Sequence, residues 1–363
     1  MRWRHGVVCA TLLIPSCAQE YDVTQRVDVD PDDVTECDFE EVDDARGFSR
    51  YTCNPVFETS GEEWSEVLIG TTFLEAPVVE HAFYQIWYAG VPEGGDGGDI
   101  QVGTAVSAEG TEWIVHDDNP GWFGRSSDAW DGLSMQRLKV AWDDERLQYR
   151  MLYGGISEQL SFGLGTAASA DGVEWAPDPA NPVLSFGGPV QGVDYAWAAA
   201  YEVVDGRHNA LLAGAERGEE RLDLWRVEGD DPAEWAAVDP VRVLRAGDDG
   251  AFDDQGFIDA AVVELDEERW LFYVGFAERI DQGDTWWAND TRVGVARWED
   301  GGWVRLQDEA FPLHNTDVGE VSAIAARPVG SRIHVWLTDR YPELDDDREV
   351  NAVGYFVFDP EAW

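Results

Sequence analysis

The sequence of 363 residues contains little positive charge: 25 Lys and Arg stand against 73 Asp and Glu, a formal net charge of −48. Only one of the basic residues is a lysine, Lys139. A nucleic-acid-binding protein needs basic side chains to neutralise phosphates, so this charge excludes that class and disfavours anionic membrane surfaces. The scarcity of lysine fits either a protein that stays soluble in concentrated salt, which screens self-repulsion, or a base composition that favours arginine codons.

Long hydrophobic runs are also scarce, and the N-terminal one is short. A basic segment, residues 1–6, precedes the apolar residues 7–14, whereas a membrane span needs about 20 apolar residues. This pattern predicts a secretory signal. Residues 13–17 resemble the lipobox of bacterial lipoproteins, which implies removal of residues 1–16 and lipid attachment to Cys17. An ordinary signal cleaved at a nearby site is the alternative.

Cysteine is limited to four residues and histidine to six. Cys9 would leave with the signal and Cys17 would carry lipid, so that Cys37 and Cys53 remain. In an exported protein this pair predicts a disulfide that closes a loop of about 16 residues and contributes about 3 kcal/mol; two free thiols are the alternative. The histidines show no metal-ligand spacing, so we expect no zinc site and no cofactor.

Helical periodicity is absent, and a repeat takes its place. GTAVSAEGTEW at 103–113 and GTAASADGVEW at 165–175 lie 62 residues apart, and Asn-Pro follows each at 119–120 and 181–182. Alternating small and apolar residues, a turn at Ala-Glu-Gly or Ala-Asp-Gly, and a strand resuming at Trp are typical of a β-hairpin. Each copy therefore belongs to a small antiparallel sheet.

A second signature occurs five times, about 60 residues apart. It consists of apolar or aromatic residues that lead into a glycine in most copies. Its copies are residues 86–90, 151–155, 211–214, 271–275 and 334–338. Five sheets of about four strands predict an all-β fold, a five-bladed β-propeller, which needs a complete ring because one blade cannot bury its own faces. We expect a signal at 1–16, an acidic tether at 17–50 and the propeller at 51–363. Residues from Phe48 to Thr72 should lead into the first blade and complete the last one with a strand, so that the ring closes.

The first strand of each blade should line a central channel. Those strands are expected at 75–79, 136–140, 195–199, 258–262 and 320–324, and the candidate site residues near their starts are Glu75, Arg137, Lys139, Trp197, Asp259 and Glu320. Asp259 interrupts an apolar strand, where a charge needs water or a partner. An aromatic-Asp element followed by glycine precedes some of these strands, at Trp130-Asp131-Gly132, at Phe252-Asp253 before Gly256 and, more loosely, at Asp194. Its recurrence favours a structural turn.

Together these motifs, over about residues 70–363, resemble the five-bladed propellers of glycoside hydrolase families 43 and 32, such as arabinanases and fructosidases. The resemblance implies three carboxylates from different blades: Glu75 as base, Asp259 or Glu320 as acid, and Asp131 or Asp194 as the residue that tunes the acid. Inverting hydrolysis would need acid and base about 6.5–9.5 Å apart. For contacts to a sugar, the candidates are Arg137 and Lys139 at the strand starts and Trp122, Trp130 and Trp197 as stacking surfaces. In blade one, Glu75-Ala76-Pro77 replaces the family's Asp-Pro.

Two functions follow from this reading. The first is an exported, lipid-anchored glycosidase or phosphorylase that acts on extracellular glycans. The second is a propeller without catalysis that binds a glycan or a protein through its tryptophans. In both cases we expect a monomer in the bacterial cell envelope, attached to membrane only by its N-terminal lipid. Calcium in the channel, found in some relatives, has no particular residue to support it here.

Overall fold

The structure, a computed structural model, describes residues 37–58, 67–75, 82–91, 100–120, 129–157, 161–185, 193–282, 285–313, 321–342 and 349–363. Within these ranges the regular structure is almost entirely β-strand, which confirms the all-β class. The helical turns are two short 3-10 helices, η1 (Pro232–Ala237) and η2 (Pro360–Ala362). Among the described residues, no helix is long and apolar enough to cross a membrane.

The strands form four sheets, each built mainly from antiparallel neighbours. The first contains β4 (Val67–Glu75), β5 (Tyr84–Val91), β6 (Gln101–Ser107) and β7 (Ile114–Val115). The second contains β8 (Ser134–Asp143), β9 (Gln148–Ile156), β10 (Phe162–Ser169), β11 (Ala176–Pro177) and β12 (Leu184–Ser185). The third contains β13 (Val193–Val204), β14 (Arg207–Glu216), β15 (Leu222–Gly229), β16 (Val241–Leu244), β17 (Gly256–Leu265), β18 (Glu268–Gln282), β19 (Thr285–Glu299) and β20 (Gly302–Arg305). The fourth contains β21 (Ala323–Val329), β22 (Arg332–Pro342), β23 (Glu349–Phe358), β1 (Phe39–Glu41), β2 (Phe48–Tyr51) and β3 (Phe57–Glu58).

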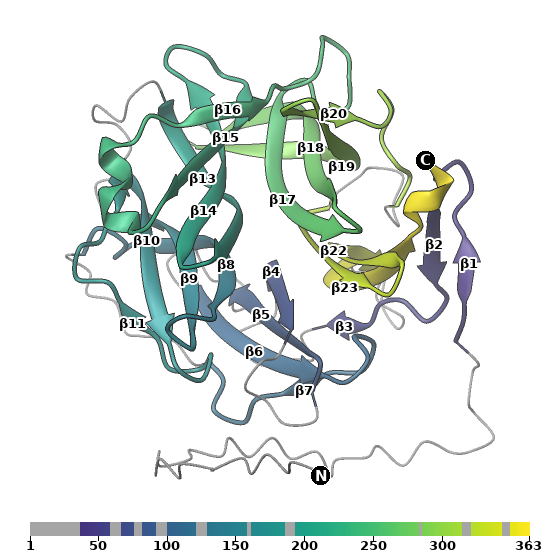
Figure 1. Cartoon of the computed structure of the whole chain (residues 1–363), viewed down its shortest axis with the longest axis horizontal. Helices are drawn as coiled ribbons and strands as arrows, with labels where there is room; N and C mark the ends of the chain where they lie inside the picture. The colour runs from purple at the N-terminus through teal and green to yellow at the C-terminus, as the bar shows by residue number, and fades with distance from the viewer. Residues whose placement is uncertain are drawn as a thin grey trace, which may run out of the picture.

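The sheets stand around a common centre (Figure 1). The eight-stranded sheet consists of two antiparallel groups, β13–β16 and β17–β20, which one parallel pair, Leu222 with Gly256, connects. The strands nearest the centre, called the inner strands below, are β4, β8, β13, β17 and β21. Each contacts the next in this order, and β21 contacts β4. Four of the five expected inner strands therefore overlap observed ones; of the fifth, expected at 75–79, only Glu75 belongs to the described residues.

The two ends of the chain meet in one sheet. β2 pairs with β23, with Phe48 opposite Phe358, and β3 also pairs with β23, with Phe57 opposite Val353 (Figure 1). The lead-in segment thus joins the last sheet, as expected. The prediction of a tether over 17–50 is wrong for β1 and β2, because Phe48 is buried against the rings of Phe272, Phe311 and Phe358. Residues 17–36, with Cys17, lie outside the described ranges.

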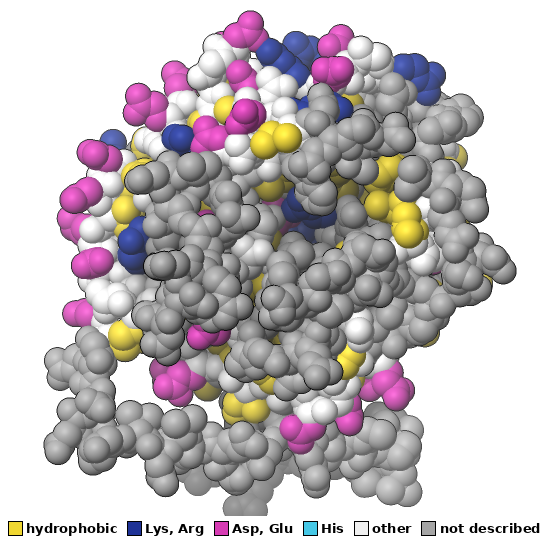
Figure 2. All heavy atoms as spheres, turned by 180° about the vertical axis from the view of Figure 1, so that it is seen from behind, with side chains coloured by type: hydrophobic (Ala, Val, Ile, Leu, Met, Phe, Trp, Pro, Cys, Tyr) yellow, Lys and Arg dark blue, Asp and Glu magenta, His cyan; other side chains and the backbone are white. Residues whose placement is uncertain are grey.

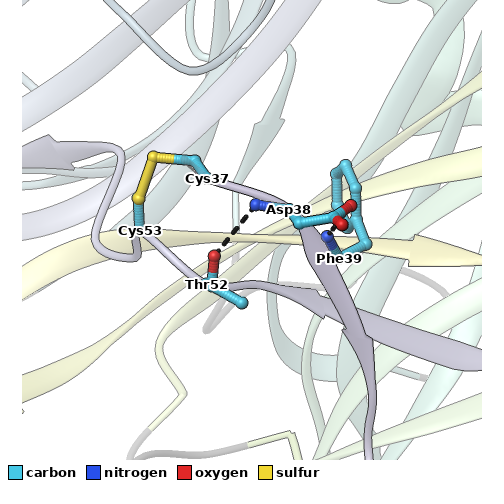
Figure 3. Close-up of a disulfide and its surroundings, with 5 residues drawn as sticks. All are labelled: Cys37, Asp38, Phe39, Thr52 and Cys53. Atoms are coloured by element: carbon cyan, nitrogen blue, oxygen red, sulfur yellow. Dashed lines mark hydrogen bonds between the residues drawn. A yellow bond between two sulfur atoms is a disulfide. The ribbon is translucent and has the colours of Figure 1, made fainter. Parts of the chain in front are cut away.

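A disulfide joins Cys37 to Cys53, the predicted pair, with Cα atoms 5.5 Å apart (Figure 3). It lies at the end of the β1–β2 hairpin where the two strands separate, next to the hydrogen bond from the Asp38 amide to the Thr52 hydroxyl. The cross-link therefore holds the hairpin that adds β1 and β2 to the last sheet.

The repeated Asn-Pro element holds the third strand of a sheet. The side chain of Asn119 accepts from the Thr104 amide and donates to the Thr104 carbonyl, at 3.0 and 2.9 Å, and Asn181 does the same with Thr166. Asn54 makes the equivalent pair of bonds with Tyr355 in β23. The N-terminal segment therefore completes the last sheet in the way that residues 119 and 181 complete theirs.

The repeated Ser-Ala-acid-Gly turn connects one sheet to the next. In the second sheet the Gly172 amide donates to Ser169 Oγ, and the Gly172 carbonyl accepts a 2.7 Å bond from the indole of Trp87 in the first sheet. The Gly110 carbonyl accepts likewise from Trp336 of the fourth sheet. The repeat thus encodes contacts between neighbouring sheets.

Large aromatic side chains fill the spaces between sheets, and Trp87, Trp235, Trp270 and Trp336 are among the largest fully buried ones. Such burial is the main favourable contribution to folding. Figure 2 shows acidic side chains along much of the rim of one face, with basic side chains both among them and near the middle.

We predict that Gly172→Ala destabilises the protein more than Gly250→Ala. Both glycines have a positive φ, 82° and 88°, and both donate their amide to a nearby side chain, so the backbone cost of about 1–2 kcal/mol is shared. A Cβ on Gly172 would lie 2.9 Å from the Trp87 ring, whereas one on Gly250 meets nothing within 4 Å. Overpacking should add about 1–3 kcal/mol at Gly172. Equal losses in urea unfolding would contradict this docking role.

Candidate functional site

Four of the predicted site residues, Arg137, Lys139, Trp197 and Asp259, meet at the centre of the molecule. Lys139 Nζ lies 2.5 Å from Asp259 Oδ1, and Asp259 Oδ2 accepts a 2.8 Å bond from the Ile324 amide. This cluster, called the hub below, therefore joins β8, β17 and β21. Residues from distant parts of the sequence become neighbours here, as the ring arrangement predicts.

Arg137 and Trp197 form the other half of the hub. The Arg137 guanidinium donates to the Ser322 carbonyl at 2.9 Å and lies 5.7 Å from the centre of the Trp197 ring, an arrangement that favours a cation–π interaction. The Trp197 indole donates to the Ile258 carbonyl at 2.9 Å. Both groups thus connect one inner strand to another.

Irregular backbone positions these side chains. The register of β8 shifts between Gln136 and Lys139, and Arg137 has a φ of 51°. Similar shifts occur between Phe257 and Asp259 in β17 and near the start of β13. A bulge inserts a residue into one strand and redirects its side chain, so the hub lies where the inner strands depart from regular pairing.

Desolvation dominates the electrostatics of the hub. Asp259 is 1% exposed and Lys139 is 6% exposed. Burial raises the pKa of Asp259, while the charge of Lys139 acts in the opposite direction. Burial also lowers the pKa of Arg137, and the charge of Asp259 partly offsets this. The single lysine of the sequence is therefore used as the counter-ion of a buried carboxylate.

Asp131 and Trp130 do not reach the hub. Tyr153 donates to Asp131 Oδ2 at 3.1 Å, and the Trp130 ring packs on Tyr153 in the same sheet. The Trp130 ring occupies the space that side chains at three glycines would fill: Gly155, Gly163 and Gly165. The structural interpretation of the aromatic-Asp element thus accounts for these contacts, and the resemblance-based roles of Asp131 and Trp130 at the substrate gain no support from them.

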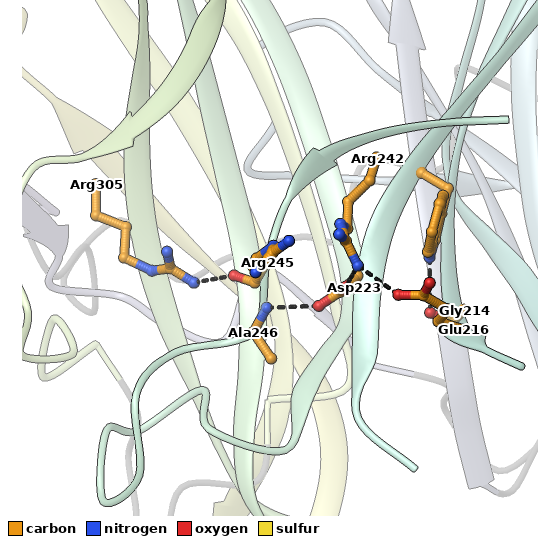
Figure 4. A network of polar contacts seen from close by, with 8 residues as sticks. Gly214, Glu216, Asp223, Arg242, Arg245, Ala246 and Arg305 are labelled. Carbon is orange, nitrogen blue, oxygen red and sulfur yellow. Dashed lines mark hydrogen bonds and ion pairs between the residues drawn. The ribbon is translucent and has the colours of Figure 1, made fainter. Parts of the chain in front are cut away.

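The second aromatic-Asp element has the same construction. Asp253 is 1% exposed and accepts from Arg305 Nε at 2.9 Å, while Phe252 stacks on Tyr273. Arg305 also donates to the Arg245 carbonyl, next to the Asp223–Arg242–Glu216 network shown in Figure 4. These contacts fasten the segment after β16 to β15 and β20.

The expectation that Glu75 begins an inner strand is wrong, because Glu75 is the last residue of β4. Residues on the N-terminal side of Glu75 in β4 lie closer to the hub. Thr72 Oγ1 is near the amide of Val140, which follows Lys139. The Phe73 carbonyl accepts a hydrogen bond from Arg327, late in β21. The apolar residues before Glu75, assumed to be a lead-in, are themselves the inner strand. The side chains of Glu75 and Asp194 are not described, and Glu320 and Trp122 lie outside the described residues.

A cavity of about 100 Å³ lies beyond the hub, toward the C-terminal ends of the inner strands. This cavity is called the axial cavity below, and its lining includes Thr72, Lys139, Glu202, Asn209, Arg269 and Arg327. Of these residues, only Lys139 was predicted from the sequence. Glu202, Arg269 and Arg327 stand late in or after inner strands, whereas the sequence analysis considered only strand starts. Consecutive alanines in these strands, at 198–200, 260–261 and 325–326, were the available signal.

Glu202 is the acidic group in the lining of this cavity. Asn209 Nδ2 donates to Glu202 Oε1 at 3.2 Å, and Arg269 lies 3.6 Å from the same oxygen. Burial raises the pKa of Glu202, and the charges of Arg269 and Arg327 oppose that effect. Among the described residues no group of three or more His, Cys, Asp or Glu side chains is placed to hold a metal ion.

Comparison with known proteins identifies the fold. No family model and no curated protein sequence matches the chain. Three solved structures are similar to this chain. A sucrose-6-phosphate hydrolase from Lactobacillus gasseri is 13% identical, with a TM-score of 0.55 over 80% of this chain and 58% of that one. A thermostable family-43 glycoside hydrolase is 12% identical, with a TM-score of 0.53 over 78% of this chain and 92% of that one. Fructan 1-exohydrolase IIa from Cichorium intybus is 16% identical, with a TM-score of 0.52 over 82% of this chain and 56% of that one. The match spans less than two thirds of the first and third of these proteins. At such identities the similarity shows the fold alone, which this chain shares with these three enzymes.

We predict that Lys139→Met lowers the free energy of unfolding by about 3–5 kcal/mol at pH 7, because it leaves Asp259 buried without its counter-ion. The folded-state pKa of Asp259 would then lie further above its unfolded value of about 3.9. A raised folded pKa means that stability is retained below the unfolded pKa and lost as pH rises through the folded one. The deficit should therefore be smallest near pH 4 and grow toward pH 7 in denaturant titrations.

The double variant Lys139→Met/Asp259→Asn should recover much of this loss, because the carboxylate that lost its counter-ion is then neutral, while Arg137 keeps its hydrogen bond to the Ser322 carbonyl. Arg207→Met, which removes an arginine that is 56% exposed, should cost at most about 1 kcal/mol. A Lys139→Met deficit that is independent of pH would contradict the assigned role of the ion pair.

Proposed function

We propose that this protein is an exported, lipid-anchored, five-bladed propeller that hydrolyses glycosidic bonds of extracellular glycans at the centre of its ring. The observation that carries the proposal is the convergence of Arg137, Lys139, Trp197 and Asp259 from three inner strands, on a fold shared with propeller glycoside hydrolases. Sugars are bound in proteins by polar groups combined with aromatic faces, and the hub offers both.

Support for five blades comes from the cycle of inner strands, in which β4, β8, β13, β17, β21 and again β4 are successive neighbours. The eight-stranded sheet then counts as two blades, since a single parallel pair joins its halves. A ring of this kind hides strand edges and brings the starts of all five inner strands to one face.

We place the reaction at that face, on the N-terminal side of the hub. Asp194 and Glu320 stand at or just before the starts of β13 and β21 and are the proposed acid and base. One carboxylic acid would protonate the departing glycosidic oxygen while the other carboxylate removes a proton from the attacking water. Asp259 is too buried and too firmly paired for either role, and we assign it to positioning the hub.

Export is supported by the signal-like N-terminus and by the disulfide. Disulfides form and persist in oxidising compartments outside the cytosol. Residues 17–36 would then form a spacer between lipid on Cys17 and the last blade, which begins at the β1–β2 hairpin.

The catalytic proposal predicts release of sugar from at least one member of a panel of arabino-, xylo-, fructo- and manno-glycans. Asp194→Asn and Glu320→Gln should each reduce kcat by about 10²–10⁴, the usual contribution of general acid–base groups. Asp230→Asn, at an acid that is 85% exposed, is the matched control and should retain activity. If the wild type binds a glycan without releasing sugar, hydrolysis is refuted and the propeller is a binding protein.

The anchoring proposal predicts that expression in a bacterial host with lipoprotein processing yields a membrane-associated, lipid-modified chain. Cys17→Ser should prevent lipid attachment and move the protein out of the detergent-extracted membrane fraction. Cys37→Ser is the control, because it removes a cysteine of the disulfide and leaves the lipobox intact. An unmodified Cys17 in the mass spectrum of the mature wild type would refute the anchor.

A further inference from the structure

The axial cavity extends from the channel into the space between the β13–β16 and β17–β20 groups. One wall is a single face of the first group. On this face Glu202 and Ala200 of β13 stand opposite Asn209 and Leu211 of β14. Leu211 in turn stands opposite Arg226 of β15. The opposite wall carries Arg269 on β18 together with Trp298 and Trp303. The cavity is thus separate from the face where the glycan is proposed to bind.

Small side chains create this space. The lining residues on three consecutive inner strands include Ala200, Ala260, Ala261, Ala325 and Ala326. Elsewhere the gaps between sheets are filled by large aromatic residues. A water molecule needs about 10–15 Å³, so a cavity of about 100 Å³ can hold several waters or one small polar ligand.

The charge of the lining is the reverse of the charge of the whole protein. Four basic residues, Lys139, Arg226, Arg269 and Arg327, line the cavity with one acid, Glu202, in a chain where acids outnumber bases by 73 to 25. Lys139 is neutralised by Asp259, so the arginines provide the excess. Their excess positive charge favours an anion over a neutral ligand.

Two of these arginines are only loosely paired. Arg226 lies 3.7 Å from Glu228 and Arg269 lies 3.6 Å from Glu202, both beyond ordinary hydrogen-bond length. Guanidinium groups bind carboxylate and phosphate oxygens in a bidentate manner. The loose pairs therefore leave donors available to an oxyanion.

An acceptor accompanies these donors. The buried Oδ1 of Asn209 has no hydrogen-bond partner among the described residues, while its Nδ2 is directed to Glu202. Leaving such an atom unsatisfied is unfavourable, and a ligand hydroxyl would satisfy it. Trp298 and Trp303, packed edge to face at 5.1 Å, add an apolar surface beside Arg269.

We propose that the axial cavity binds a small hydroxylated oxyanion, such as a sugar acid or sugar phosphate, with Arg269, Arg327 and Arg226 on the anionic group and Asn209 on a hydroxyl. This site does not rest on the proposed hydrolysis, because it uses different residues on the other side of the hub. Glu202 sets the affinity, since it is the one negative charge that faces the ligand.

The test is calorimetric titration of the full-length protein with glucuronate, glucose 6-phosphate and glucose. We expect one or both anions to bind and glucose to bind at least tenfold more weakly. Arg269→Met and Arg327→Met should each weaken anion binding at least tenfold. Glu202→Gln, which removes the opposing charge, should tighten it by about threefold or more, a gain that damage to the fold would not produce.

Arg221→Met is the matched control, because this exposed arginine pairs with Asp249 on the surface and neither residue lines the cavity, and it should leave affinity within twofold of wild type. Asp194→Asn should also leave it unchanged, which separates this site from the hydrolytic proposal. Preference between glucuronate and glucose 6-phosphate identifies the oxyanion. Absence of binding by both at 10 mM, equal binding of glucose, or wild-type affinity in both arginine variants would overturn the proposal.

Discussion

The ring depends on the pairing of β2 and β3 with β23, which joins the two ends of the chain in one sheet. The contact of β21 with β4 and the bond from Trp336 to the Gly110 carbonyl join the same sheet to the start of the ring. Each sheet buries its faces against two neighbours, so an open ring would expose the aromatic residues of its end sheets. Asn54 holds Tyr355 as Asn119 holds Thr104, so the closing segment uses the same hydrogen bonds as an ordinary connection within a sheet. The disulfide between Cys37 and Cys53 then fixes the hairpin that contains β2.

When the ring of sheets closes, the inner strands converge at its centre. The charged side chains that they carry there must then be paired. Lys139 and Asp259 form a buried ion pair, and Arg137 spans to the Ser322 carbonyl. Together they separate the N-terminal side of the channel from the axial cavity. The free-energy cost of removing these charges from water is offset only when both partners and their hydrogen bonds are present. The hub is therefore a division between two environments, one beside each end of the inner strands.

Several features were predicted correctly from sequence because they repeat or are local. The spacing of the aromatic-glycine segments located the sheets, and the turn glycines at 110 and 172 marked hairpins whose carbonyls bind Trp336 and Trp87 of neighbouring sheets. The recurrence of the aromatic-Asp element indicated a structural turn, as Asp253 with Arg305 illustrates. Glu75 was assigned to the wrong end of its strand because Ala76-Pro77 was aligned with a family motif, while the preceding apolar strand lacks a distinctive marker.

The strand periodicity, the repeat, the excess of acid and the cysteine pair can all be read directly from the chain, since each depends on residue type and local spacing. Which charges meet depends instead on how the strands are arranged in space. Asp259 lies 120 positions from Lys139 in the sequence, and Glu202 lies 67 positions from Arg269, so no local pattern connects them. Their contacts arise from the order and register of strands around the axis, and the same register leaves the alanines facing one another, where they form a cavity instead of a filled core.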